Sequence, residues 1–398
     1  MDTKTLFEWS ATYHMPNFSR APICLVRGDG MRVWDTEGRE YLDFGAGLAV
    51  TALGHSHPRV TGAIQEAAAT LLHVSNLYHN VPQIHLAKLL CEHSFADQVF
   101  FSNSGAEANE AAFKLVRKYA KDRLSSDRYE IISTRNSFHG RTLATVTATG
   151  QEKYHHGFEP LPAGFKHVPY DDLRAMERAV DSHTAGILVE PIQGEGGVHV
   201  PDDDYLPGLR KLCDETGAVL MFDEIQTGIA RTGRMWGYEH SGIEPDVMTV
   251  AKALANGIPI GATLARREIA SAFVPGTHGS TFGGNPFVTA VALTAFTTVL
   301  DEKLADRAAR MGRRLMDGLR AMQGRRPVIR SVRGRGLLIG AELSRSAGPL
   351  VDACRDAGLL VLSAGDQVLR LAPPLIVTEA DCDRALGIID TVLARLTS

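Results

Sequence analysis

The chain has 398 residues, of which 44% are hydrophobic and 22% charged, and 42 Lys and Arg residues nearly balance 46 Asp and Glu residues. This composition is typical of a globular enzyme with two or three domains and argues against a disordered chain. The net charge of −4 argues against a nucleic-acid or anionic-membrane partner, since either would require a basic excess. No apolar run approaches the roughly 20 residues that span a bilayer.

The N-terminus and the cysteines indicate the compartment. Residues 1–10 include acidic side chains and no apolar stretch, so we expect no secretory signal. The cysteines are scattered and never form a CxxC pair, which indicates free thiols in a reducing cytoplasm rather than disulfides or a zinc site. They are Cys24, Cys91, Cys213, Cys354 and Cys382. We therefore expect a cytoplasmic protein without a metal site.

The first of three segments covers residues 1–56 and is irregular and β-rich. The stretches 32–34 and 40–42 flank the turn-forming sequence 35–39, a pattern that predicts a β-hairpin. We expect this segment to join a small domain formed by the C-terminal part of the chain.

The second segment, residues 57–294, alternates short apolar runs with helical stretches. This pattern is typical of a mainly parallel sheet with crossover helices. After Gly105 a helix is predicted with one apolar face, acidic residues in its first turns and basic residues later, an order that complements the helix dipole. The clearest strand-like runs lie at 99–101, 131–132, 186–189, 218–222 and 247–250. We expect this segment to form a large α/β domain.

The third segment, residues 295–398, changes pattern again. Apolar residues recur at helical spacing from 300 to 319, and β-like runs and a last helix follow. The runs lie at 336–343, 359–362 and 368–371, and the helix starts near residue 378. The sequence predicts a smaller α+β domain here.

Residues that could bind a ligand or take part in a reaction lie at three strand ends. Ser104, Gly105 and Ala106 join a strand to a helix start, where free N–H groups and small side chains can hold a phosphate. Asp223 ends the most apolar run, where open α/β sheets bind ligands, and could pair with a protonated ring nitrogen. Lys252 follows another run, where partial desolvation lowers the pKa of an amine and makes it a nucleophile.

Each of these features also has a plain structural explanation: a capped helix, a surface acid, and a lysine that reaches solvent along its stem. Together, however, they supply a phosphate cup, an acid for a pyridinium and an amine for a Schiff base, which are the parts of a pyridoxal phosphate site. A nucleotide site is not indicated, because no G-x-G-x-x-G follows a strand and no G-x-x-x-x-G-K-[ST] occurs.

Other residues are suited to bind an anionic substrate. Phe138 could stack on a ring, and Arg141 could hold a carboxylate. Arg370 lies between two leucines, and Glu195 belongs to a glycine-rich turn at 190–197. Surface salt bridges and an ordinary turn are the alternative explanations for these residues.

Six motifs occur in an order that resembles a known family. They are NSGAEANE at 103–110, FHGRT at 138–142, EPIQGEG at 190–196, DEIQTG at 223–228, AK at 251–252 and STFGGNP at 280–286. Together they resemble the class III, ω-type aminotransferases, and within this class the acetylornithine aminotransferases. The likeness covers nearly the whole chain. It implies PLP fold type I (aspartate-aminotransferase-like), an α/β fold whose large domain has a mainly parallel seven-stranded sheet, beside a small α+β domain.

The resemblance implies roles for the residues that bind the cofactor. Lys252 would form the Schiff base with pyridoxal 5'-phosphate and later shuttle a proton. Asp223 would keep the pyridine nitrogen protonated, Gln226 would bond the phenolic oxygen, and Phe138 would stack on the ring. Ser104, Gly105 and Ala106 would hold the phosphate. The resemblance also implies a homodimer with shared active sites, in which Thr281 reaches the phosphate of the partner subunit and Ser280 lies beside the substrate.

The implied reaction transfers the terminal amine of N2-acetylornithine to 2-oxoglutarate, giving N-acetylglutamate 5-semialdehyde and glutamate, a step of arginine biosynthesis. Arg141 would hold the distal carboxylate of the donor, and Arg370 the carboxylate next to the reacting carbon of 2-oxoglutarate. Glu195 would pair with Arg370 while the donor is bound, and swing away for the oxo acid.

The chain departs from the family pattern at two places, and the second bears on the donor. The sequence Ala253–Gly257 replaces part of a glycine run after the lysine. Leu48 takes the place of an aromatic hydroxyl found in ornithine δ-aminotransferases, which favours an acylated donor. Succinyldiaminopimelate, succinylornithine, ornithine and 4-aminobutyrate stay open as donors. An aminomutase and a catalytically silent binding protein are the alternatives outside the aminotransferases.

Overall fold

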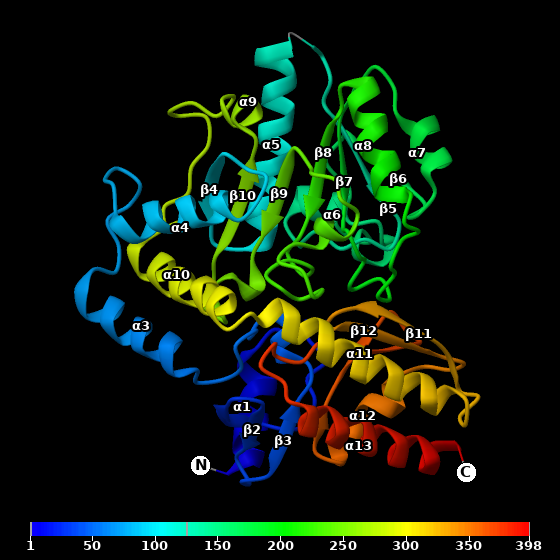
Figure 1. The fold of residues 1–398 in the computed structure, drawn as a ribbon. Helices are drawn as coiled ribbons and strands as arrows, with labels where there is room; N and C mark the ends of the chain where they lie inside the picture. The colour runs from blue at the N-terminus through cyan, green and yellow to red at the C-terminus, as the bar shows by residue number, and fades with distance from the viewer. Residues whose placement is uncertain (1, 125, 398) are drawn as a thin grey trace.

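The computed structural model describes residues 2–124 and 126–397, so Met1 and Ser398, the ends of the outer predicted segments, lie outside the described part. Figure 1 shows a large sheet with its helices in the upper part of the molecule, and the N-terminal and C-terminal elements below it. The described strands form one seven-stranded and two four-stranded sheets. Among the described residues, no helix is both long and apolar enough to cross a bilayer.

The seven-stranded sheet is mainly parallel, as the sequence predicts. Only β10 runs antiparallel to its two neighbours, β4 and β9. Every residue of β7 to β10 is buried, which explains why the sequence shows mainly apolar runs at 186–189, 218–222 and 247–250. The order is β4 (Gln98–Ser102), β10 (Gly261–Ala265), β9 (Val247–Val250), β8 (Val219–Asp223), β7 (Thr184–Val189), β5 (Glu130–Thr134) and β6 (Phe165–Val168).

Helices follow the strands of this sheet, and α5 buries the face that the sequence marks as apolar. The helices are α3 (Pro58–Thr70), α4 (Val81–Glu92), α5 (Gly105–Leu124), α6 (Leu143–Ala148), α7 (Leu173–Ala179), α8 (Tyr205–Thr216), α9 (Arg267–Ala270) and α10 (Pro286–Asp301), with short 3-10 helices η1 (Glu152–Tyr154), η2 (Gly237–His240) and η3 (Lys252–Ala255).

The C-terminal part contains an antiparallel sheet flanked by helices. Its strands are β11 (Ile329–Arg335), β12 (Leu338–Leu343), β15 (Val368–Leu371) and β14 (Leu362–Ala364), in that order. Its helices are α11 (Leu304–Gln323), α12 (Gly348–Asp356) and α13 (Glu379–Thr397). The helical pattern from 300 to 319 is in fact divided between α10 and α11, because Lys303 has a φ of +50° and breaks the helix.

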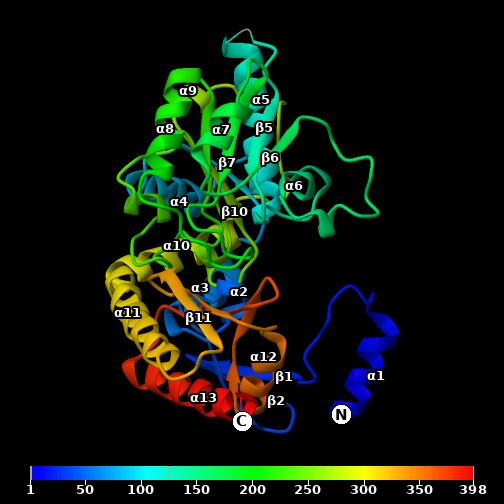
Figure 2. The same ribbon diagram turned by 90° about the vertical axis from the view of Figure 1, so that its right-hand side faces the viewer.

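The N-terminal segment pairs with a strand from the other end of the chain. The predicted hairpin is present as β2 (Arg32–Asp35) and β3 (Glu40–Asp43), and β1 (Leu25–Asp29) pairs with β2. β3 in turn pairs in parallel with β13 (Leu359–Leu360). The short α2 (Ala46–Ala49) follows β3, and Figure 2 shows α1 (Thr3–Tyr13) projecting from the body of the molecule.

Candidate active site

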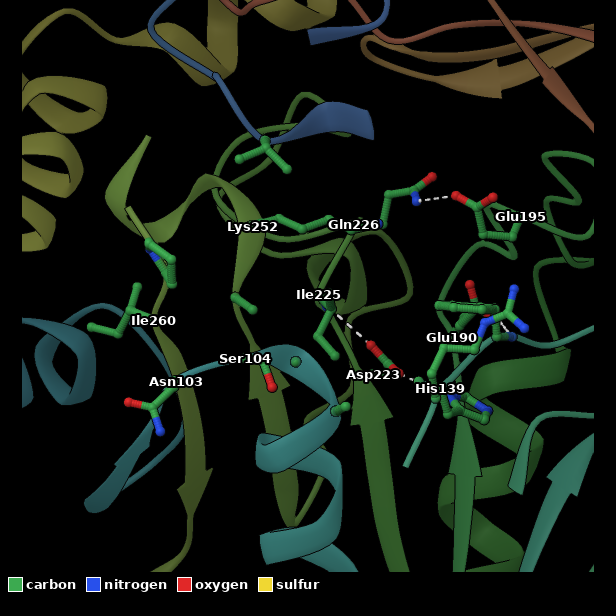
Figure 3. Close-up of a pocket in the computed structure, with 18 of the residues that line it drawn as sticks. Asn103, Ser104, His139, Glu190, Glu195, Asp223, Ile225, Gln226, Lys252 and Ile260 are labelled. Atoms are coloured by element: carbon green, nitrogen blue, oxygen red, sulfur yellow. Dashed lines mark hydrogen bonds and ion pairs between the residues drawn. The ribbon is translucent and has the colours of Figure 1, made fainter. Parts of the chain in front are cut away.

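A cavity of about 380 Å³ lies where several strands of the large sheet end, and Figure 3 shows the side chains around it. Residues from four strand ends and from the loop at 257–260 line it. Of the predicted site residues, the cavity is lined by Ser104, Gly105, Ala106, Phe138, Arg141, Glu195, Asp223, Gln226 and Lys252. The structure therefore brings together residues that are as far apart in sequence as 104 and 252.

Asp223, the last residue of β8, is held by a network of buried polar groups. Its Oδ2 accepts hydrogen bonds from His139 Nδ1 and Asn109 Nδ2, both at 2.8 Å, and its Oδ1 accepts from the N–H of Ile225 at 3.1 Å. Asn109 is fixed in turn, because its Oδ1 accepts from Thr249 Oγ1 at 2.8 Å. The carboxylate, 3% exposed, is therefore held in one orientation at the cavity wall.

Lys252 directly follows Ala251 at the end of β9 and has a left-handed backbone, with φ of +39°. Within the described residues it makes no hydrogen bond or ion pair, and burial lowers the pKa of its amine, although the nearby Glu195 carboxylate opposes that shift. A buried amine of lowered pKa is a nucleophile that can also accept and return a proton.

The segment that departs from the family's glycine run is anchored by Asn256. This residue is left-handed, with φ of +49°, a conformation that asparagine tolerates better than most residues. Its Oδ1 accepts from the N–H of Leu53 at 2.8 Å, and its Nδ2 donates to the carbonyl of Gly54 at 3.1 Å. The end of η3 is thereby tied to the segment that precedes α3.

The start of α5 can bind an anion. Ser104 Oγ accepts from the N–H of Glu107, while the N–H groups of Gly105 and Ala106 have no acceptor among the described residues. A Cβ on Gly105 would lie 2.7 Å from Ile225 Cδ1, so any larger residue here would require the Ile225 side chain to move. Two free amides at a helix N-terminus that borders the cavity are suited to a phosphate.

Arg141 is an exposed cation that has no carboxylate partner among the described residues. Its Cζ lies 3.8 Å from the centroid of the Tyr154 ring and 5.4 Å from that of Phe138. The Phe138 ring meets the Tyr154 ring edge-on at 6.1 Å, and the N–H of Phe138 donates to Glu190 Oε1 at 3.0 Å. The stack orients Arg141 and leaves its guanidinium available for an anion.

Glu195, Arg370 and Gln226 form a second charged group. Arg370 Nη1 donates to Glu195 Oε1 at 2.6 Å and to Gln226 Oε1 at 3.2 Å, and Gln226 Nε2 donates to Glu195 Oε1 at 3.1 Å. Burial raises the pKa of Glu195, but the Arg370 guanidinium and the Lys252 amine outweigh it and lower the value to about 2. Arg370 is 2% exposed and lies behind this acid, so Glu195 masks its charge.

Ser280 and Thr281 do not line the cavity of this chain. Ser280 Oγ accepts from Asn103 Nδ2 at 3.2 Å and from the N–H of Gly283 at 2.9 Å, while Thr281 is exposed. Their predicted roles stay predictions. Leu48 is 48% exposed and does not line the cavity either, whereas its neighbour Val50 does.

Sequence reasoning did not assign roles to His139, Asn109, Glu190 and Tyr154. Glu190 is buried, which raises its pKa to about 7, and it accepts from the backbone N–H groups of Phe138 and Gly194. His139 adjoins Phe138 in one of the quoted motifs, and Glu190 opens another, so their positions offered a signal. Asn109 also lies in a quoted motif, but an asparagine within a helix gives no sign of its partner, and Tyr154 lies in none of the motifs and offered little. Among the described residues, no group of His, Cys, Asp and Glu is arranged to hold a metal ion.

Comparisons with known proteins agree with this site. Residues 14–393 match the family model described as aminotransferase class-III. The acetylornithine aminotransferases of Myxococcus xanthus and Caldanaerobacter subterraneus are 51% and 48% identical to the chain, over 96% and 98% of it and 96% and 100% of their own lengths.

A crystal structure of the ornithine aminotransferase from Toxoplasma gondii superposes with a TM-score of 0.96 at 36% identity, and covers 100% of this chain and 96% of its own. A structure of that enzyme crystallized in the presence of oxidized glutathione has partial occupancy of PLP at its active site. The acetylornithine aminotransferase from Elizabethkingia anophelis gives a TM-score of 0.90 at 33% identity, with coverage of 99% and 100%. The expected PLP fold type I is thus confirmed, and the chain belongs to the class-III aminotransferase family.

Proposed function

We propose that the chain is a pyridoxal-phosphate-dependent aminotransferase that moves the terminal amine of N2-acetylornithine to 2-oxoglutarate. The reaction gives N-acetylglutamate 5-semialdehyde and glutamate, a step of arginine biosynthesis. The observation that carries the proposal is that Lys252, Asp223 and the free amides of Gly105 and Ala106 border one cavity. Full-length relatives near 50% identity that are named acetylornithine aminotransferase support the donor.

The residues around the cavity fit pyridoxal phosphate. The free N–H groups of Gly105 and Ala106 suit its phosphate, and the buried carboxylate of Asp223 suits a protonated ring nitrogen. The Lys252 amine, which has no other partner among the described residues, suits a covalent bond to its aldehyde carbon. When bound, pyridoxal phosphate supplies the carbon that receives the amine and a ring that accepts electrons.

The protein contributes position, charge and proton transfer. Asp223 holds the proton on the ring nitrogen, and its own orientation is held by His139 and Asn109. Lys252 removes the proton from the δ-carbon of the donor and later delivers one to the α-carbon of the oxo acid. Gln226 would bond the phenolic oxygen of the cofactor, and Phe138 would stack on its ring.

Two arginines divide the recognition of carboxylates. Arg141 has no carboxylate partner among the described residues, so it is free to bind the distal carboxylate of acetylornithine. Arg370 binds the carboxylate beside the reacting carbon of 2-oxoglutarate, once Glu195 has moved away. While the donor is bound, the Glu195–Arg370 pair at 2.6 Å keeps an unpaired cation from facing the methylene chain.

We also propose a homodimer with shared active sites. Asn76 Nδ2 donates to the carbonyls of Ser280 and Gly283, which joins two loops into one surface. That surface exposes Leu77, Tyr78 and Phe282 at 85%, 69% and 61%, beside Thr281. Large apolar side chains grouped in this way favour burial against a second copy, which would bring Ser280 and Thr281 to the neighbouring site.

The location and the domain division are further proposals. All five cysteines are free, which supports a reducing cytoplasm. The division into 1–56, 57–294 and 295–398 is supported by the three sheets, although residue 294 falls within α10 and the last boundary therefore crosses a helix.

A panel of amine donors tests the proposed function. Purified holoenzyme is supplied with 2-oxoglutarate and acetylornithine, ornithine, succinylornithine, succinyldiaminopimelate or 4-aminobutyrate, and glutamate formation is followed. The proposal predicts the highest kcat/KM for acetylornithine. A clear preference for another donor would replace the proposed substrate, and the absence of glutamate with every donor would overturn the proposed reaction.

A further inference from the structure

Arg231 is a buried arginine that the proposed reaction does not use. It follows a strained turn in which Ile229 and Ala230 have φ of +54° and +66°, and it is itself 1% exposed. Among the described residues no carboxylate pairs with it, and its Nη2 has no hydrogen-bond partner. A buried guanidinium without an acid is costly, so a structural filler of this volume would ordinarily be apolar.

The contacts of Arg231 join three segments. Its Nη1 donates to the carbonyls of Leu337 and Pro373, and its own carbonyl accepts from the N–H of Leu337 at 2.9 Å. Leu337 lies just before β12, and Pro373 lies just after β15. The loop between β8 and β9 is thereby fastened to two strands of the C-terminal sheet.

The same loop and the same strand also meet inside the active site. Gln226 lies on the loop between β8 and β9, and Arg370 on β15, and their side chains are hydrogen-bonded at 3.2 Å. Arg231 and Pro373 make a second junction between these two segments, a few residues further along each. The two junctions fix the strand that carries Arg370 against the loop that carries Gln226.

We propose that Arg231 is a positioning residue that sets the placement of Arg370, and thereby the affinity for the oxo acid rather than for the amine donor. This inference rests on the proposed function, in which Arg370 binds the carboxylate next to the reacting carbon. The donor's carboxylate is bound by Arg141, whose contacts are with the rings of Tyr154 and Phe138 and not with these two segments.

Loss of Arg231 leaves other backbone contacts of the same strand end in place. The N–H of Ala372 donates to the carbonyl of Phe44 at 2.8 Å, and the N–H of Leu375 donates to the carbonyl of Ala52 at 2.7 Å. We therefore expect Arg231 variants to fold, with Arg370 less firmly placed.

The test compares Arg231→Met, which removes every donor, with Arg231→Lys, which keeps a cationic donor. Arg307→Met is the matched control, because Arg307 also donates to a backbone carbonyl, that of Val377, at 2.9 Å. KM is measured for 2-oxoglutarate and for the donor, and calorimetry measures the binding of glutarate, a five-carbon dicarboxylate that cannot react. Urea unfolding of each variant accompanies the kinetics.

For Arg231→Met we expect about a tenfold rise in KM for 2-oxoglutarate and in Kd for glutarate, with KM for the donor changed less than about twofold. Arg231→Lys should recover much of the loss, and Arg307→Met should show no such difference. Equal changes for both substrates, or none, would overturn the inference. If Arg231→Met does not fold, Arg231→Lys and Arg231→Gln are compared instead, and the inference again requires a larger change for 2-oxoglutarate and glutarate than for the donor. The difference between the effect on the oxo acid and the effect on the donor can be measured with whichever amine reacts. The result is therefore independent of the test of acetylornithine as the donor.

Discussion

Replacing Glu195 by glutamine separates the two half-reactions. Glutamine keeps an oxygen that can accept from Arg370 and removes the negative charge that masks it. The pKa of Glu195 falls from an ordinary 4.5 to about 2 in the folded chain, so its net surroundings favour the charged carboxylate by roughly 3 kcal/mol. A hydrogen bond to a charged group contributes about 1.5–3 kcal/mol, which corresponds to a factor of about ten to a hundred.

The expected effects have opposite signs for the two substrates. With Glu195→Gln, the unmasked Arg370 faces the methylene chain of the donor, so the apparent Kd for acetylornithine should rise about tenfold or more. The oxo acid no longer has to displace an ion pair, so the apparent Kd for 2-oxoglutarate should fall.

Stopped-flow spectroscopy measures each half-reaction alone: donor added to the pyridoxal form, and oxo acid added to the pyridoxamine form. Glu244→Gln is the control, because it removes the carboxylate of an exposed pair with Arg266, at 2.9 Å. Unchanged values for both substrates with Glu195→Gln, or equal weakening of both, would refute the reasoning.

Three further predictions follow from the site and the surface. Lys252→Ala should lower the rate of the donor half-reaction at least about a thousandfold by single-turnover measurement, since no other described group is placed to move the proton; a loss below tenfold would contradict this role. Phe282→Asp should convert the proposed dimer to monomer in sedimentation experiments, because it would place a charge in the proposed apolar interface, and an unchanged dimer would show that the interface lies elsewhere. Glu224 is buried with its pKa raised to about 7, so the stability that its protonated form contributes below pH 4.5 falls as the pH rises and is lost above pH 7. The stability advantage of the wild type over Glu224→Gln in urea should therefore be larger at pH 5 than at pH 8, and the reverse order would contradict the pKa shift.

The large sheet was predictable where its strands are apolar throughout. β7, β8 and β9 are buried on both faces, so they appear in the sequence as mainly apolar runs, with Thr249 the one polar residue between their end residues. β6 (Phe165–Val168) and β10 (Gly261–Ala265) were not marked, because one contains Lys and His and the other small residues that also suit a loop. Whether such segments become strands depends on their pairing with distant parts of the chain, and this pairing has no local sequence signature.

Nine of the predicted site residues line one cavity, because strand ends of a parallel sheet converge, whereas Arg370, Ser280 and Thr281 do not line it. The partners that orient the site residues were harder to foresee. Nothing local indicates that His139 and Asn109 share one oxygen of Asp223, or that Arg231 meets the carbonyl of Pro373, 142 residues away. Within one chain Ser280 and Thr281 do not line the cavity, and in the proposed dimer they would act at the site of a second copy.

The central claim is that Lys252 and its neighbours exchange an amine with acetylornithine through bound pyridoxal phosphate. The most direct measurement adds N2-acetylornithine to the holoenzyme without any oxo acid and follows the visible spectrum. The account predicts that the absorption band of the lysine-bound cofactor converts to that of the pyridoxamine form in a single turnover, and that 2-oxoglutarate restores the original band. A lysine-bound band that acetylornithine leaves unchanged would contradict acetylornithine as the donor, and a protein that shows no such band would contradict the claim as a whole.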